Sequence, residues 1–151
     1  MGKRIFYFVF LFFIISCLEK KKYENNPVLA QRLYEEGQQL LSERIKIQGA
    51  DPIKARELNK KILKKFEAAY NADTTNSKVL LFASECTMYE RDFKKCLYWT
   101  LKLVQQDTTN FAKPWVYERI GECYAELGEE EKSKTYYEKE SALRNKSNVT
   151  K

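Results

Sequence analysis

A tetrapeptide that occurs twice constrains the fold of this chain more than any other feature. Residues 73–76 read Asp-Thr-Thr-Asn, and the same four residues return at 107–110, which is 34 residues later. Each copy ends one segment with helical apolar periodicity and precedes the next. A 34-residue period built from two helices is typical of stacked helical hairpins. We therefore predict an all-α fold of three antiparallel helical hairpins, stacked in chain order over residues 27–145.

The composition suits helices and offers little for catalysis. Only 5 Gly and 3 Pro occur in 151 residues, while 10 Tyr and 9 Phe supply apolar side chains for one packed domain. The chain has no histidine, so it lacks the commonest general base and the commonest metal ligand. We predict a protein that is not an enzyme and binds neither metal nor cofactor. The net charge is +6, but the 27 basic residues are interspersed with 21 acidic ones. This excess of positive charge does not by itself indicate a nucleic-acid partner.

The first 16 residues have the pattern of an export signal. A short basic start at residues 1–4 is followed by 11 uncharged residues at 5–15. As a helix, that apolar run would be about 16 Å long, roughly half of a bilayer's hydrocarbon core. A basic segment followed by a short apolar segment is typical of a signal peptide.

The residues that end this segment, Ile14-Ile15-Ser16-Cys17, resemble the lipobox of bacterial lipoproteins. The resemblance implies cleavage after Ser16, thioether lipidation of Cys17 and acylation of the new N-terminus. Several acyl chains anchor a protein stably, whereas one does not. Polar residues 17–26 would then be a tether, and Leu18, where an inner-membrane retention signal would have Asp, favours the outer membrane. The competing interpretation is an ordinary signal peptide, or a membrane helix with a chance cysteine.

The expected helix boundaries follow from capping residues. Asn26 and Asp51 each precede a proline, which predicts helix starts at Pro27 and Pro52. The residues at 73–76 are predicted to end the second helix and cap the third, and a short turn is expected at 91–92. Gly128 ends the fifth helix. The sixth helix is expected to fray from Asn145, with a disordered tail at 146–151.

The fifth and sixth predicted helices carry a nameable pattern. It consists of a large residue, an apolar–Gly pair, a Tyr, a Gly, a small residue and an aromatic, here Tyr117, Ile120, Gly121, Tyr124, Leu127, Gly128, Ser133 and Tyr137. This series resembles the tetratricopeptide repeat. The preceding hairpin has Leu80, Ala83, Ser84, Thr87, Cys96 and Leu103 in the same places, and the first has Gly37, Leu40, Ile62, Phe66 and Ala69. The resemblance implies a short right-handed superhelix in which small residues let paired helices cross closely.

In tetratricopeptide stacks, the first helix of every hairpin lines a concave groove. The resemblance places these residues in it: Tyr34, Gln38, Leu81, Glu85, Met88, Trp115, Glu118 and Glu122. Aromatic and acidic side chains together suit an extended or helical peptide, and they favour a basic partner. The predicted function is a membrane-anchored bacterial lipoprotein that acts as an interaction scaffold for another envelope protein or peptide. The alternative is a small-ligand or glycan-binding accessory lipoprotein, which would need an enclosed pocket.

Cysteines and threonines provide two further candidate sites. Once Cys17 is lipidated, Cys86, Cys96 and Cys123 remain, and we predict three buried free thiols. A Cys86–Cys123 disulfide is the alternative, although adjacent repeats usually hold such positions too far apart. Thr74 and Thr108 lie in Asp-Thr-Thr sequences that resemble an O-glycosylation acceptor motif of Bacteroidota, but a helix-end signal also explains both copies.

Overall fold

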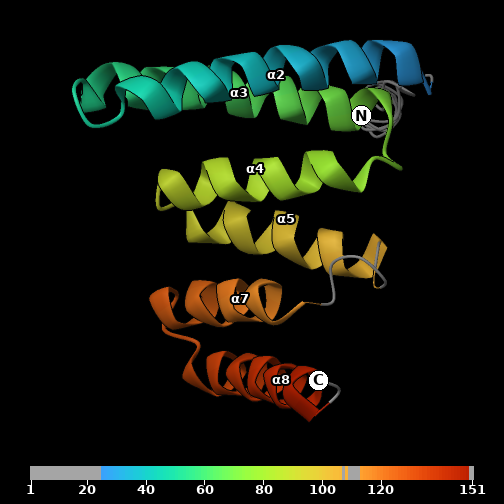
Figure 1. The fold of residues 1–151 in the computed structure, drawn as a ribbon, viewed down its shortest axis with the longest axis vertical. Coiled ribbons are helices and arrows are strands. Elements are labelled where there is room, and N and C mark those ends of the chain that lie inside the picture. Colours follow the sequence, from blue (N-terminus) through green and yellow to red (C-terminus); the bar gives the residue numbers. More distant parts are fainter. Residues whose placement is uncertain (1–24, 107, 109–112, 150–151) are drawn as a thin grey trace, which may run out of the picture.

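A computed structural model describes residues 25–106, 108 and 113–149 of the chain. These residues form six α-helices and are drawn as a ribbon in Figure 1. In chain order, the helices are α2 (Pro27–Ile47), α3 (Pro52–Ala72), α4 (Ser77–Tyr89), α5 (Phe93–Gln106), α7 (Pro114–Glu126) and α8 (Glu130–Val149).

The helices pack as consecutive pairs. α2 packs against α3, α4 against α5, and α7 against α8. The pairs are joined by contacts of α3 with α4 and of α5 with α7, so that they stack in chain order (Figure 1). This arrangement confirms the predicted all-α fold of three helical hairpins.

Two helix starts have the predicted caps. The Asn26 side chain accepts a hydrogen bond from the backbone N–H of Leu29 (2.9 Å), and Asp51 accepts one from Lys54 N–H (2.9 Å). A proline follows each cap at a position whose N–H would have no partner within the helix. The backbone N–H of Asn26 also donates to the Ala72 carbonyl (2.8 Å), which fastens the start of α2 to the end of α3.

The first Asp-Thr-Thr-Asn sequence ends α3 as predicted, but its Asn76 side chain does not cap α4. Asn76 precedes α4 without making a side-chain capping bond. The Asp73 carboxylate instead accepts hydrogen bonds from the backbone N–H (2.9 Å) and the hydroxyl (2.6 Å) of Thr75. Two residues of separation is the geometry of a local Asx turn, which competes with capping. Of the second copy, only Thr108 lies among the described residues.

The last helix is longer than predicted, since α8 continues past Asn145 to Val149. Its last turns have a stabilising ion pair at the favourable four-residue spacing, between Arg144 and Glu140. Arg144 also reaches Glu118 of α7 (3.1 Å) and thereby fastens α8 to its pair.

Among the described residues, none of the helices is both long and apolar enough to cross a membrane. Residues 1–24, which include Cys17 and the expected signal segment, lie outside the described part.

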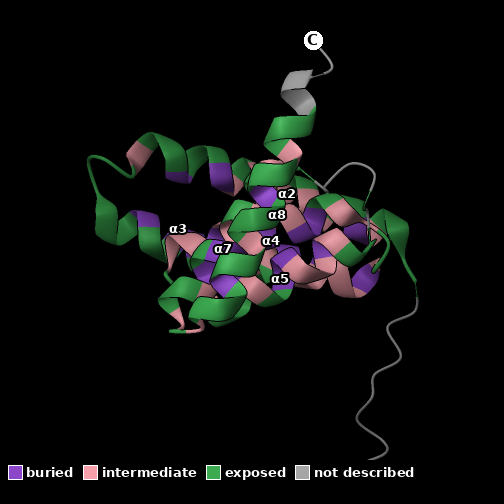
Figure 2. Ribbon diagram, turned by 90° about the horizontal axis from the view of Figure 1, so that it is seen from below, coloured by how far each residue is buried: buried purple, intermediate pink, exposed green. Residues whose placement is uncertain are grey.

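The main core lies between the first two hairpins. Phe66 of α3 is fully buried at its centre, and its ring stacks on Phe82 of α4 with 5.4 Å between centroids. The Tyr34 ring of α2 packs against both of them. Gly37 of α2 lies directly against the Phe66 ring, where a side chain would not fit. Figure 2 shows buried residues on the sides where helices face one another, and a largely exposed α8.

Candidate partner-binding face

The predicted groove residues lie on the first helix of each pair. Tyr34 and Gln38 lie on α2; Leu81, Glu85 and Met88 on α4; Trp115, Glu118 and Glu122 on α7. The three on α7 are exposed, and the five on α2 and α4 are half-buried. The α7 residues are therefore the most accessible part of this face.

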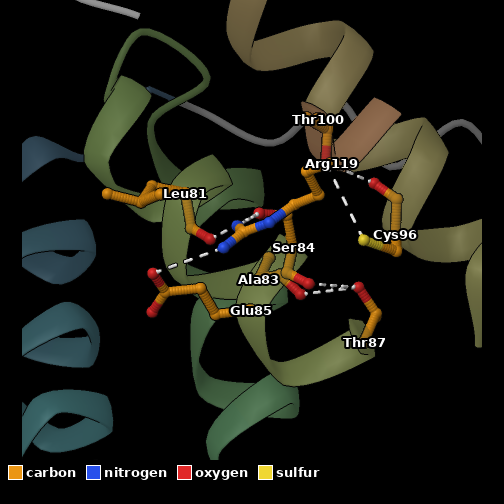
Figure 3. Close-up of polar contacts among 8 residues, drawn as sticks. All are labelled: Leu81, Ala83, Ser84, Glu85, Thr87, Cys96, Thr100 and Arg119. Carbon is orange, nitrogen blue, oxygen red and sulfur yellow. Dashed lines mark hydrogen bonds and ion pairs between the residues drawn. The ribbon is translucent and has the colours of Figure 1, made fainter. Parts of the chain in front are cut away.

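Arg119 of α7 organises the junction between α4 and α7 (Figure 3). Its Nη1 donates to the Ser84 hydroxyl (2.9 Å), which in turn donates to the Leu81 carbonyl (2.7 Å). Nη2 lies 3.9 Å from a Glu85 carboxylate oxygen. The guanidinium also lies over the Trp115 ring, 5.3 Å from its centroid. One arginine thus brings together the predicted residues Glu85 and Trp115, and the indole gains a cation–π contact.

These contacts change the expected charge of the face. Glu85 is paired with Arg119, and Glu118 is paired with Arg144. Two of the three predicted acidic residues therefore already have a cationic partner. The face around Trp115 is closer to neutral than the predicted acidic groove, and this weakens the argument for a basic partner. Arg119 was not among the predicted residues, although its place one helical turn after Trp115 puts both on one face of the helix.

Two predicted groove residues contribute to the core instead. Tyr34 and Leu81 pack against the buried cluster around Phe66. Burial raises the pKa of the Tyr34 hydroxyl, which keeps it neutral. Gln38 has its Nε2 group buried, with no hydrogen-bond partner among the described residues. At the α2 end, the face is therefore mainly the packed surface of the first hairpin.

A buried polar cluster joins α2, α3 and α4, and no pattern in the sequence indicates it. Arg44 is only 8% exposed, and its Nη1 donates to the Asn59 side-chain oxygen (2.7 Å). The Asn59 amide donates in turn to the Cys86 carbonyl (2.8 Å) and to Glu90 (3.0 Å). The guanidinium also lies over the Tyr89 ring, 4.3 Å from its centroid. Asn59 therefore holds a buried cation and bridges two hairpins.

The three remaining cysteines are buried free thiols, as predicted. Burial raises the pKa of the Cys86 thiol to about 12. The two thiols that lie close enough to influence each other are those of Cys96 on α5 and Cys123 on α7, rather than those of Cys86 and Cys123. The interaction between these two thiols lowers the pKa of Cys96, and together with burial it raises the pKa of Cys123.

We expect these thiols to be unreactive in the folded protein. In the chain that begins at residue 17 and carries Cys17→Ser, Ellman's reagent at pH 8 should label no thiol without denaturant. Attack requires an accessible thiolate, and the three sulfur-bearing side chains are at most 1% exposed. The same protein in guanidinium chloride should release three equivalents of dye. Rapid labelling of even one thiol in the native state would show that the helix packing around that cysteine opens readily.

Other candidate chemistry is sparse among residues 25–149. No group of three His, Cys, Asp or Glu side chains in the described part is arranged to hold a metal ion. Thr74 and Thr108 are both exposed, which leaves the glycosylation hypothesis open.

Neither the family models nor the curated proteins give a significant match to this chain.

Proposed function

We propose that this chain is a membrane-anchored bacterial lipoprotein whose helical hairpins form a tetratricopeptide-like scaffold for another envelope protein. The packing within two hairpins supports the repeat assignment. A Cβ atom at Gly37 would lie 2.7 Å from the Phe66 ring, and one at Gly121 would lie 3.2 Å from the Tyr137 ring. The same small residue thus faces the same aromatic position in the first and third hairpins, as the repeat pattern requires. Such a stack would wind as a short right-handed superhelix.

The observation that carries the binding proposal is the exposed indole on α7, which lies against a guanidinium. Trp115 is 38% exposed, yet Arg119 holds its ring from one side. Tryptophan and arginine are the residues that most often dominate binding energy at protein interfaces. The contact with Arg119 restricts the indole, so less side-chain entropy is lost when a partner binds. We infer that a partner segment packs on Trp115 and extends towards Glu122 and the α4 residues Glu85 and Met88.

The proposed location depends on the sequence of the leader. The lipobox-like residues 14–17 support lipidation of Cys17 and retention in the envelope, and Leu18 favours the outer membrane. Residues 17–26 would then hold the helical domain near the lipid surface, because ten extended residues span at most roughly 36 Å. A scaffold with this reach would collect partners close to the membrane.

Crosslinking and affinity capture from the native envelope test this proposal. We expect a defined protein partner with the lipidated wild type, and about a tenfold or greater loss of it with Trp115→Ala plus Glu118→Ala. Tyr98→Ala is the matched control, since this exposed aromatic lies on α5 rather than on a first helix. Thermal unfolding of each variant separates lost binding from lost folding.

Two outcomes would contradict the proposal. Undiminished capture by the double variant would place the partner elsewhere on the molecule. Co-purification of a small molecule or glycan, with no protein, would favour the accessory ligand-binding alternative.

A further inference from the structure

The outer side of α8 is a stacking surface that no described helix covers. In the first hairpin, Phe66 of α3 is fully buried because Phe82 of the following α4 stacks on it. Thr100, at the equivalent place on α5, is also fully buried where α7 follows. Tyr137 has this place on α8, and it is 39% exposed. The surface that receives the next helix is thus present a third time without an occupant.

This surface is hollowed and belongs to one stripe of α8. An open hollow of about 820 Å³ runs along the helix. Its lining includes Glu130, Ser133, Lys134, Tyr137, Glu138 and Ser141, which recur at spacings of three and four residues. Ser141 is exposed and small enough to let another helix approach closely, while Tyr137 offers apolar area one turn before it. A helix is the element that fits such a surface.

The charges on the stripe indicate which helix would pack on it. Glu130, Lys134 and Glu138 follow one another at four-residue intervals, and the described residues offer none of them an ion pair. An antiparallel copy of the same helix, centred near residue 136, puts Lys134 of each copy beside Glu138 of the other. A partner helix with basic residues in place of the two glutamates, and an acidic residue in place of the lysine, would bring like charges together. The stripe is therefore complementary to itself.

We propose that two copies of this chain associate through their α8 stripes, related by a two-fold axis. A two-fold axis perpendicular to α8 makes the two helices antiparallel, and each copy then covers the other's Tyr137 with the same contacts. The interface shares no residue with the face around Trp115, so the dimer and the envelope partner can bind together. The dimer is also independent of the lipid anchor, so the two proposals fail separately.

Sedimentation equilibrium on the chain from residue 17 onward, carrying Cys17→Ser, tests the dimer and keeps every described residue. The wild type should sediment as a dimer that dissociates on dilution. Lys134→Glu and Glu138→Lys should each weaken self-association by about tenfold or more, because each places like charges together twice. An equimolar mixture of these two variants should associate again, since the mixed dimer restores opposite charges at both positions. Lys139→Glu, on the opposite side of α8, should leave association unchanged.

A wild type that remains monomeric at every concentration would overturn the proposal. So would a dimer that persists unchanged in both single variants, or a mixture that associates no better than its components. Circular dichroism of each variant shows whether α8 is still folded, and this makes a loss of association interpretable. Recovery in the mixture is the decisive result, because damaged folding in two variants cannot be repaired by mixing them.

Discussion

Replacing Asn59 with leucine is expected to lower the free energy of unfolding by about 3 kcal/mol. The cause is Arg44, which remains buried after its hydrogen-bond partner is removed. Arg44 is almost fully buried, and Asn59 is the one hydrogen-bond acceptor that the described residues give its guanidinium. Its Nε group already lacks a partner there. A buried cation without an acceptor costs more than the loss of one ordinary hydrogen bond. Urea unfolding followed by circular dichroism measures the change.

A second substitution separates the cation from the rest of the cluster. Arg44→Met in the Asn59→Leu background removes the buried charge, so we expect it to recover a large part of the lost stability. The Cys86 carbonyl would keep a donor, because the backbone N–H of Glu90 also reaches it at 3.2 Å. If Asn59→Leu costs less than about 1 kcal/mol, Arg44 must be reaching water, and the cluster would not join the hairpins in the way described.

An exposed ion pair provides the matched comparison. Lys65 of α3 lies 2.6 Å from Glu36 of α2, and its hydrogen bond lowers the pKa of that carboxyl. Both side chains are accessible to water, so Lys65→Met should change stability little. This variant also breaks a polar contact between α2 and α3. A large loss there as well would mean that the hairpin is sensitive to any change between these helices, and not to the buried cation in particular.

The contrast between the buried Arg44–Asn59 pair and the exposed Lys65–Glu36 pair shows which part of the fold the sequence could predict. Helix periodicity and capping residues are local signals, so the starts at Asn26 and Asp51 and the pairing of helices were predictable. The burial of Arg44 and Asn59 is not local, because it depends on Tyr89 and Glu90 at the end of a later helix. In sequence, an arginine and an asparagine within a helical pattern indicate a solvent-exposed position. Only the packing of the second hairpin on the first makes them internal.

The candidate face was predictable in outline for the same reason. The repeat register placed all eight predicted residues on α2, α4 and α7, which are the first helices of their pairs. It did not predict that Phe82 would draw Tyr34 into the core, or that Arg119 would neutralise Glu85. Both effects depend on side chains that reach across from a neighbouring hairpin. The register therefore defines the face, whereas its charge and accessible area depend on contacts between hairpins.

The second large effect is expected at Gly37, where alanine should destabilise the protein by about 2 kcal/mol. The new Cβ atom would lie 2.7 Å from the Phe66 ring. That ring is fully buried and has Tyr34 and Phe82 against it, so it cannot move away without disturbing the main core. Alanine favours a helix by about 1 kcal/mol over glycine, which offsets only part of the strain. Thermal and urea unfolding of Gly37→Ala measure the balance.

Gly121→Ala is the control, and it should be close to neutral. Its Cβ would lie 3.2 Å from the Tyr137 ring, a smaller overlap than at Gly37. In the single chain, Tyr137 lies at the uncovered side of α8 and is partly exposed, so its ring can shift by a few tenths of an ångström. Phe66→Leu should relieve the strain in Gly37→Ala, because leucine lacks the ring edge that the methyl group meets. If both alanine variants lose the same stability, the cost comes from helix crossing in general; unequal losses would show that the buried neighbour decides whether a small residue is required.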